Sequence, residues 1–378
     1  MSKTTKIVIG IIILAVVIWG ITASKTKKVE GTLEIGVISA LTGNVAYIGE
    51  STMKGAEIGK IKAQQEHPGL SINMYHEDSM FVPKTGIDAY NKLRTSNNIN
   101  ALITMASNVS VAVEPLAIKD NVLFIAASTL ASGFTTPDDL TFRMTTKADT
   151  EAQPTFEYLT QKKLTKLGIM YMNNEIGISL RDSLKKMAAS TNVSIVAEEG
   201  YAADASDFKT ILLKMKSAGI DSLYLASLAN HSAVILKQAE ELKIDVPFLS
   251  YRATEDPVLV KNAGALAEGI LYTNAYDSNS TDSQNAEFIK LYKEKYNETP
   301  NGYAAEAYEA TRLIADTYAK CGSTIKNVEN IQCAKNFLFS VKNRLTLFGP
   351  LSFDGNGDVM YPFFMKTVKD GKFVRLME

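Results

Sequence analysis

Apolar runs and helical patterns alternate along most of this chain. One such unit begins with the apolar run Ala101 to Met105, continues with a helical pattern over 109–117, and ends with a second apolar run, Val122 to Ala127. Runs of five or six apolar residues without polar alternation are typical of parallel strands that are buried on both faces, and a helix between them makes the strands neighbours. The pattern predicts a strand, a helix and a second strand in one parallel sheet.

Polar residues follow both of these predicted strands. Ser107 and Asn108 come after the first strand, and Ser128 and Thr129 come after the second. Both pairs should lie at the same edge of the sheet, beside the free N–H groups of the next helix, which is an arrangement that suits a small anion such as a carboxylate. The alternative is that these side chains only cap helices.

The same alternation runs through two stretches of the chain, separated by a transition at 143–150. Strands are predicted before it at 33–38, 71–75, 101–105 and 122–127, and after it at 167–171, 193–197, 222–226, 248–250 and 269–273. Beyond Tyr276 the pattern changes to long helices at 284–296, 303–319 and 328–342, followed by strands at 360–368 and 373–376. An alternation that restarts indicates two open parallel sheets, each doubly wound, with a cleft between them.

Composition narrows the classes of function. The 378 residues are 46% hydrophobic and 21% charged, with a formal net charge of −1, so the clustered positive charge of a nucleic-acid surface is missing. The three histidines are widely spaced, no metal site or cofactor is indicated, and no nucleophile with a base or phosphate loop stands at a useful spacing. We therefore expect a non-enzymatic protein.

The N-terminal residues indicate export. Lys3 and Lys6 precede the uncharged run Ile7 to Ala23, and lysines return at 25, 27 and 28. This order is typical of an export signal, and seventeen residues are at the short limit for spanning a membrane. Residues 1–29 are accordingly expected to be either a cleaved signal or a membrane anchor, and the body of the protein to be extracytoplasmic.

The two cysteines, Cys321 and Cys333, lie at the end of one predicted helix and the start of the next. Disulfides form outside the cytoplasm, so a bridge between these two residues is one expectation. Two unpaired structural thiols are the other.

An ordered set of segments resembles a known family. The segments are GVISALTGNVAYIGESTMKGAE, the unit around Ser107, GIMYMNNEIG at 168–177, residues 224–239, AGALAEG at 263–269, and GPLSFDGNGD near the C-terminus. In this order they resemble type I periplasmic binding proteins of the Leu/Ile/Val-binding branch, which capture substrates for branched-chain amino-acid ABC transporters. The resemblance implies two lobes joined by three crossovers, with lobe 1 at 30–146 plus 277–354 and lobe 2 at 147–276 plus 355–378, that close around a ligand.

The resemblance also implies site residues. Ser107 matches a ligand-holding serine of the family, while Ser128 and Thr129 are candidates on the second loop. Tyr47, Ile48 and Tyr276 should line the entrance. From the second lobe, Ile176 and Leu228 replace tyrosines of the family, with Tyr251 and Arg252 beside them.

Arg252 departs from the family pattern, because an acidic residue that pairs with the ligand's ammonium is usual at its position. A buried ammonium facing a guanidinium is strongly unfavourable. Either Glu255 or Asp256 supplies the carboxylate instead, or the ligand lacks an ammonium and presents an acid group to Arg252. A third alternative is that Arg252 points into solvent.

By this resemblance the function expected is capture of a branched-chain amino acid or a related small carboxylate for an ABC permease and its ATPase. The alternative is a ligand-binding sensor that acts with a separate signalling partner.

Overall fold

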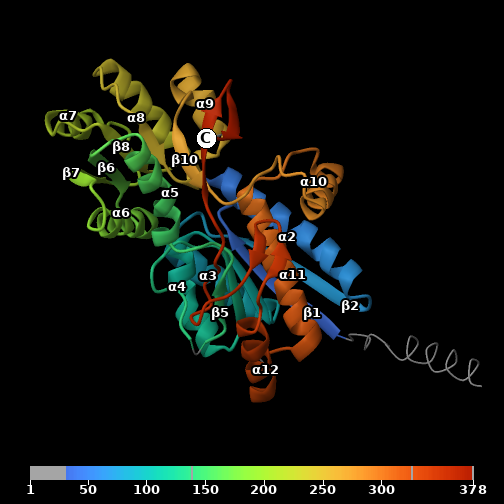
Figure 1. Ribbon diagram of the computed structural model, residues 1–378. Coiled ribbons are helices and arrows are strands. Elements are labelled where there is room, and N and C mark those ends of the chain that lie inside the picture. Colours follow the sequence, from blue (N-terminus) through green and yellow to red (C-terminus); the bar gives the residue numbers. More distant parts are fainter. Residues whose placement is uncertain (1–30, 138, 325–326, 377–378) are drawn as a thin grey trace, which may run out of the picture.

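The computed structural model describes residues 31–137, 139–324 and 327–376, which form two α/β lobes (Figure 1). Each lobe is built around one sheet with helices packed against it. The predicted fold class, two doubly wound lobes, is confirmed.

The first lobe contains a five-stranded sheet in the order β2-β1-β3-β4-β5, in which every neighbouring pair is parallel. Its N-terminal elements are β1 (Gly31–Ser39), α2 (Ala46–Glu66), β2 (Leu70–Asp78), α3 (Pro83–Ser96), β3 (Ala101–Met105), α4 (Ser107–Lys119), β4 (Leu123–Ser128) and β5 (Thr141–Arg143). Its later elements are α10 (Ser283–Tyr296), α11 (Gly302–Cys321), α12 (Val328–Phe339), β11 (Arg344–Thr346) and β12 (Gly349–Leu351).

The second lobe contains a seven-stranded sheet in the order β14-β13-β10-β9-β8-β6-β7. Its elements are α5 (Ala148–Gln161), β6 (Lys166–Met172), α6 (Glu175–Ala188), β7 (Ser194–Tyr201), α7 (Lys209–Ser217), β8 (Ser222–Ala226), α8 (Ala229–Glu241), β9 (Phe248–Ser250), α9 (Pro257–Ala263), β10 (Leu271–Asn274), β13 (Phe364–Lys369) and β14 (Lys372–Arg375), with 3₁₀ turns η1 (Arg252–Thr254) and η2 (Gly264–Ala267). The strands from β6 to β10 are parallel, whereas β13 and β14 form an antiparallel edge.

The sequence pattern did not predict three short strands, β5, β11 and β12. β5 lies inside the stretch interpreted as a transition, and β11 pairs with β12 in a small antiparallel hairpin. Each has three residues and stands outside the regular alternation of strands and helices, so neither length nor context indicates a strand. β5 nevertheless extends the first sheet because it pairs with β4.

The chain passes between the lobes three times. It does so between β5 and α5, between β10 and α10, and between β12 and β13. The crossovers expected near Thr146, Tyr276 and Asp354 fall in these connections. The boundaries of the two lobes at single-residue level stay predictions.

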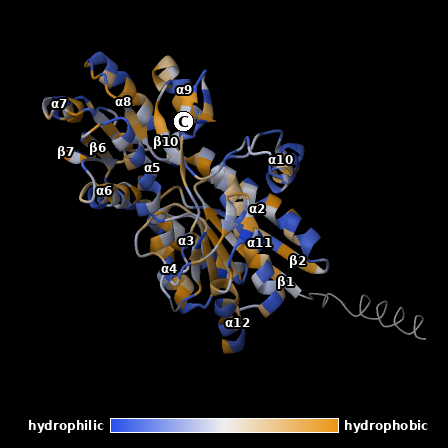
Figure 2. Ribbon diagram, in the orientation of Figure 1, coloured by the Kyte–Doolittle hydropathy of each residue, from blue (hydrophilic) through white to orange (hydrophobic). Residues whose placement is uncertain are grey.

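The core of the first lobe depends on close contact between α2 and α11. The helix α2 presents small residues to α11, and a Cβ atom added to Gly55 would lie 2.1 Å from the carbonyl oxygen of Ala304. Figure 2 shows apolar colours on the strands and on the inner faces of helices, and polar colours on their outer faces. Glycine at this position therefore sets how closely the two helices approach.

Gly55→Ala is expected to destabilise the protein by about 2 kcal/mol, because the new methyl group would meet backbone that cannot rotate away. Urea unfolding monitored by circular dichroism measures the change. Gly355→Ala is the matched control, since a Cβ there has open space and the backbone has no positive φ. Equal midpoints for the two variants would show that the helices separate at no cost.

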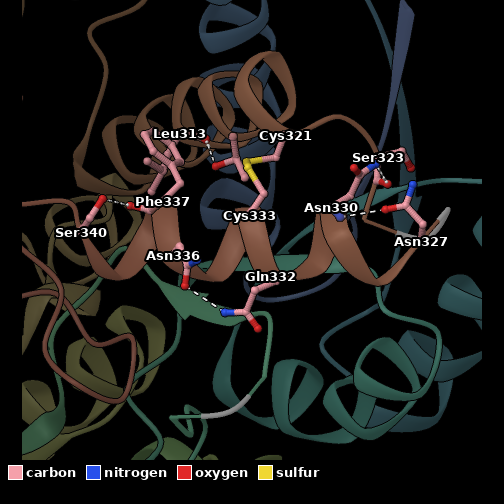
Figure 3. The surroundings of a disulfide bond; sticks show 11 residues. Leu313, Cys321, Ser323, Asn327, Asn330, Gln332, Cys333, Asn336, Phe337 and Ser340 are labelled. Carbon is pink, nitrogen blue, oxygen red and sulfur yellow. Dashed lines mark hydrogen bonds between the residues drawn. A yellow bond between two sulfur atoms is a disulfide. The ribbon is translucent and has the colours of Figure 1, made fainter.

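The two cysteines are joined in a disulfide that links the end of α11 to α12 (Figure 3), with the two Cα atoms 5.5 Å apart. Hydrogen bonds hold the same region: the side chain of Asn330 donates to the Ser323 carbonyl, and the Asn327 side chain caps the first turn of α12. Of the two alternatives for Cys321 and Cys333, a disulfide or two unpaired thiols, the structure contains the disulfide.

The predicted export segment, residues 1–29 with its apolar run Ile7 to Ala23, lies outside the described residues. Among the residues from 31 onward that the structure describes, none of the helices is long and apolar enough to cross a membrane.

Candidate functional site

The two strand-end loops of the first lobe meet at the carboxyl edge of its sheet. β3 and β4 are neighbours, and α4 begins directly after β3. The Ser107 hydroxyl accepts a hydrogen bond of 3.0 Å from the backbone N–H of Leu130. This bond ties the loop after β4 to the start of α4, so the two loops form one surface.

A pocket lies between this surface and the second lobe. It is lined by Val45, Ile48, Phe81, Met105, Ala106, Ser107, Ser128, Leu130, Ile176, Leu228, Tyr251, Arg252, Ala253 and Tyr303. Seven of the predicted ligand-binding residues are in this set: Ile48, Ser107, Ser128, Ile176, Leu228, Tyr251 and Arg252. The lining is mostly apolar, Arg252 is its one charged residue, and it contains no carboxylate.

Arg252 joins the two lobes. It follows β9 in the second lobe, but its Nη2 donates a 2.5 Å hydrogen bond to the Ser128 hydroxyl, and its Nη1 forms an ion pair with Glu306 of α11. Its guanidinium also lies 5.1 Å from the centre of the Tyr303 ring. Only 5% of the residue is exposed, so the expectation of a solvent-facing arginine is wrong.

Two buried carboxyl groups adjoin Arg252. Glu306 pairs with the guanidinium, while Glu151 of α5 accepts a 3.2 Å hydrogen bond from the Arg252 backbone N–H. Burial raises the pKa of Glu306 to about 7 although Arg252 opposes the shift, and burial likewise raises the pKa of Glu151. Burial would lower the pKa of Arg252, but Glu306 and the other nearby groups raise it above its ordinary value, so the guanidinium stays charged.

Glu255, one of the two candidates for replacing the missing acid, has other partners. It accepts hydrogen bonds from Tyr272 and Asn274 and forms a 2.7 Å ion pair with the buried amine of Lys366. It does not line the pocket. Asp256 caps the start of α9, where it accepts a hydrogen bond from the backbone N–H of Val258. Both carboxylates therefore have structural partners.

Three further predicted residues lie next to the pocket without lining it. The Thr129 hydroxyl donates a hydrogen bond to the Ser110 hydroxyl, and the Asn108 amide donates one to the Phe81 carbonyl. Both side chains therefore stabilise the loops around the pocket. Tyr47 is 36% exposed at the start of α2, one residue before the lining residue Ile48.

Tyr276 was expected at the entrance, and the structure corrects this. The residue is fully buried in the core of the first lobe, where its hydroxyl donates to the Asn285 side chain and its ring packs against Phe288 and Phe348. The aromatic residue that reaches the pocket from this part of the chain is Tyr303, at the start of α11.

Glu306, Glu151 and Tyr303 were missed as site residues. A signal for Glu306 was present, because it lies three residues after Tyr303 and four before Ala310, on the apolar face of its helix. A carboxylate on such a face needs a buried partner. The sequence contains no sign that the partner would be Arg252, fifty-four positions earlier.

In the described part of the chain, no group of three or more histidine, cysteine, aspartate or glutamate side chains could hold a metal ion. The polar atoms of the pocket suit an organic solute held by hydrogen bonds and charge.

Two lobes with a pocket between them are typical of binding proteins that enclose a ligand. Comparison with known proteins identifies the group: the model of the periplasmic binding protein family matches residues 32–372, and the chain belongs to that family. The resemblance inferred from the sequence is thereby confirmed.

Individual relatives agree with this assignment. The Leu/Ile/Val-binding protein homolog 2 of Brucella abortus (strain 2308) is 26% identical over 347 residues, which cover 90% of this chain and 92% of that protein. The fold is shared with LivJ of Streptococcus pneumoniae in complex with isoleucine, at a TM-score of 0.80, 24% identity, and coverage of 91% of this chain and 98% of that one.

The fold is also shared with a solute-binding protein of an R. palustris ABC transporter in complex with benzoate. The TM-score is 0.81 at 20% identity, and the match covers 92% of this chain and 96% of that one. Proteins of this fold therefore include one solved with an amino acid and one solved with an aromatic acid.

Proposed function

We propose that this chain is the extracytoplasmic solute-binding component of an ABC importer, and that it captures a small carboxylate without an ammonium group. The observation that carries the proposal is the pocket lining, in which Arg252 is the one charged side chain and no carboxylate is present. An anionic head group fits such a site, and the apolar residues around it suit an apolar or aromatic body.

The first lobe would hold the head group through Ser107 and Ser128 together with N–H groups at the start of α4. The second lobe would close over it with Ile176, Leu228, Tyr251 and Arg252. These residues meet around a cavity of about 20 Å³, which is too small for benzoate, so capture would need the lobes to open and then to close less tightly around the ligand. After capture the protein would deliver the solute to a permease and its ATPase, a step that membership of the family supports.

An amino acid is the second candidate ligand. Glu306 Oε2 and Glu151 Oε2 are buried without a hydrogen-bond partner, and an ammonium group that reached them would satisfy both. The relatives named for leucine, isoleucine and valine favour this candidate as well.

A thermal-shift screen separates the candidates. We expect benzoate or 4-hydroxybenzoate to raise the melting temperature, by an amount that corresponds to about 2.7 kcal/mol at a hundredfold excess over Kd, because a ligand that binds only the folded state stabilises it by mass action. Leucine, isoleucine and valine should have little effect. If only these amino acids stabilise the protein, the second candidate replaces the first.

Ser107→Phe tests whether the pocket is the binding site. Its ring would fill the space above the start of α4, and we expect at least a hundredfold loss of affinity for the acid found in the screen, since the head group can no longer reach the loop. Circular dichroism checks that the variant is folded. A folded Ser107→Phe protein with unchanged affinity would mean that the ligand binds elsewhere.

A further inference from the structure

The charges around the pocket do not balance. Arg252 supplies one positive charge, whereas Glu306 and Glu151 both contact it and are both buried. Each carboxyl group also has one oxygen, Oε2, without a hydrogen-bond partner. A ligand carboxylate that enters beside Arg252 would add a further negative charge to this buried site.

Three negative charges against one guanidinium would be strongly unfavourable out of water. A buried carboxyl group relieves such an excess by taking up a proton, since a neighbouring like charge disfavours its ionised form. We propose that the protein takes up a proton when it binds an anionic ligand, and that Glu306, coupled to Glu151, is the group that receives it. This inference rests on the proposed function, because it requires an ammonium-free carboxylate in the pocket.

The surroundings of Glu306 support the assignment. Four titratable or charged groups from different elements face it: Arg252 after β9, Glu151 on α5, Tyr303 on its own helix, and Tyr361 in the segment that leads to β13. Of these, the two tyrosines stay neutral because burial raises the pKa of each hydroxyl above its ordinary value. The carboxyl groups are the sites left for a proton.

The direction of the pH effect follows. With a pKa of about 7 for Glu306 in the free protein, the group is largely protonated at about pH 5.5 and largely ionised at about pH 8. A bound anion raises this pKa further. At low pH the group is protonated both with and without the ligand, so the affinity should be constant there. Above about pH 7 it should fall by up to about tenfold per pH unit, the slope for one linked proton. Glu306 and Glu151 titrate as a pair, and this is the behaviour of the pair.

The experiment is calorimetric titration of the full chain with benzoate, and separately with L-isoleucine, at about pH 7.5 in two buffers of different ionisation enthalpy. The difference in observed heat gives the number of protons exchanged. We expect uptake of about half a proton or more per benzoate. Glu306→Gln should reduce this number towards zero and remove most of the decrease in affinity at high pH.

Glu309→Gln is the matched control. Glu309 is one turn further along α11 and equally buried, but it pairs with Arg312 and accepts a hydrogen bond from the Leu347 N–H, away from the pocket. Its proton exchange on binding should equal that of the unchanged protein. Benzoate binding without proton uptake, or uptake that survives Glu306→Gln, would overturn the inference and leave the proposed function standing.

Two other results would also overturn the inference. Binding of L-isoleucine alone would overturn the proposed ligand class, and the inference with it. A ligand-free measurement keeps the inference testable in every case: if the carboxyl ¹³C signal of Glu306, identified by its loss in Glu306→Gln, shows that the group is still fully protonated at about pH 8.5, it cannot take up a proton on binding and the inference is wrong.

Discussion

Arg252→Leu is expected to lower the affinity for the ligand by about a hundredfold or more, and also to destabilise the protein by about 3–5 kcal/mol. The first effect follows from the loss of a charge-assisted hydrogen bond to the head group. The second arises because Glu306 and Glu151 would stay buried without the guanidinium that compensates them. Calorimetric titration measures the first effect, and urea unfolding measures the second.

A second substitution separates the two effects. Arg252→Leu combined with Glu306→Leu removes both members of the ion pair, so much of the stability should return. Affinity should stay low because the positive charge is still absent. Arg312→Leu serves as the control, since Arg312 pairs with Glu309 and Glu66 within the first lobe. That variant should lose stability without losing affinity. Affinity restored in the double variant would show that Arg252 does not contact the ligand.

Reduction of the Cys321–Cys333 disulfide is expected to lower the free energy of unfolding by about 3 kcal/mol. The bridge closes a short loop, with a sequence separation of 12, and the stabilisation comes mainly from restricting the unfolded chain. The melting temperature should drop by several degrees in the presence of a reductant. Differential scanning calorimetry, with and without dithiothreitol, measures this shift.

The double variant Cys321→Ser/Cys333→Ser is the control for this effect. It should melt near the temperature of the reduced protein and be insensitive to the reductant. Ligand affinity should be unchanged, because the bridge joins the end of α11 to α12 (Figure 3), whereas Tyr303 is at the start of α11. A protein that melts at the same temperature in both redox states would mean that α12 is held by its other contacts, such as the Asn330 hydrogen bond to Ser323.

Much of the fold could be predicted because its signals are local. The buried strands β3, β4 and β8 are continuous apolar runs, and α10 and α11 begin within one residue of their predicted starts. The antiparallel edge formed by β13 and β14 was predicted as two strands, but its pairing direction was not, since that depends on which strand the returning chain meets. Pairing is a non-local property, and a single sequence does not display it.

The site divides in the same way. Ser107 and Ser128 were found because they follow buried strands, and such strands end at one edge of a parallel sheet. The position of Tyr276 was predicted wrongly because an aromatic residue at a crossover can face either the cleft or the core. Here its hydroxyl donates to Asn285 and its ring packs against Phe288, both on α10, so it lies in the core. The role of Glu255 was left open between alternatives, because Lys366, over a hundred positions later, had no visible connection to it in the sequence.

The sequence by itself determined the class of protein: two doubly wound lobes, a polar strand edge around Ser107, and an arginine at a position where the resemblance implies an acid. Only the tertiary structure decided what that arginine does. Folding brings Ser128, Glu306 and Glu151 to Arg252 from three distant segments, and burial among them changes the pKa of both carboxyl groups. The charge state of a site depends on which groups share a region without water, and that is a consequence of three-dimensional proximity.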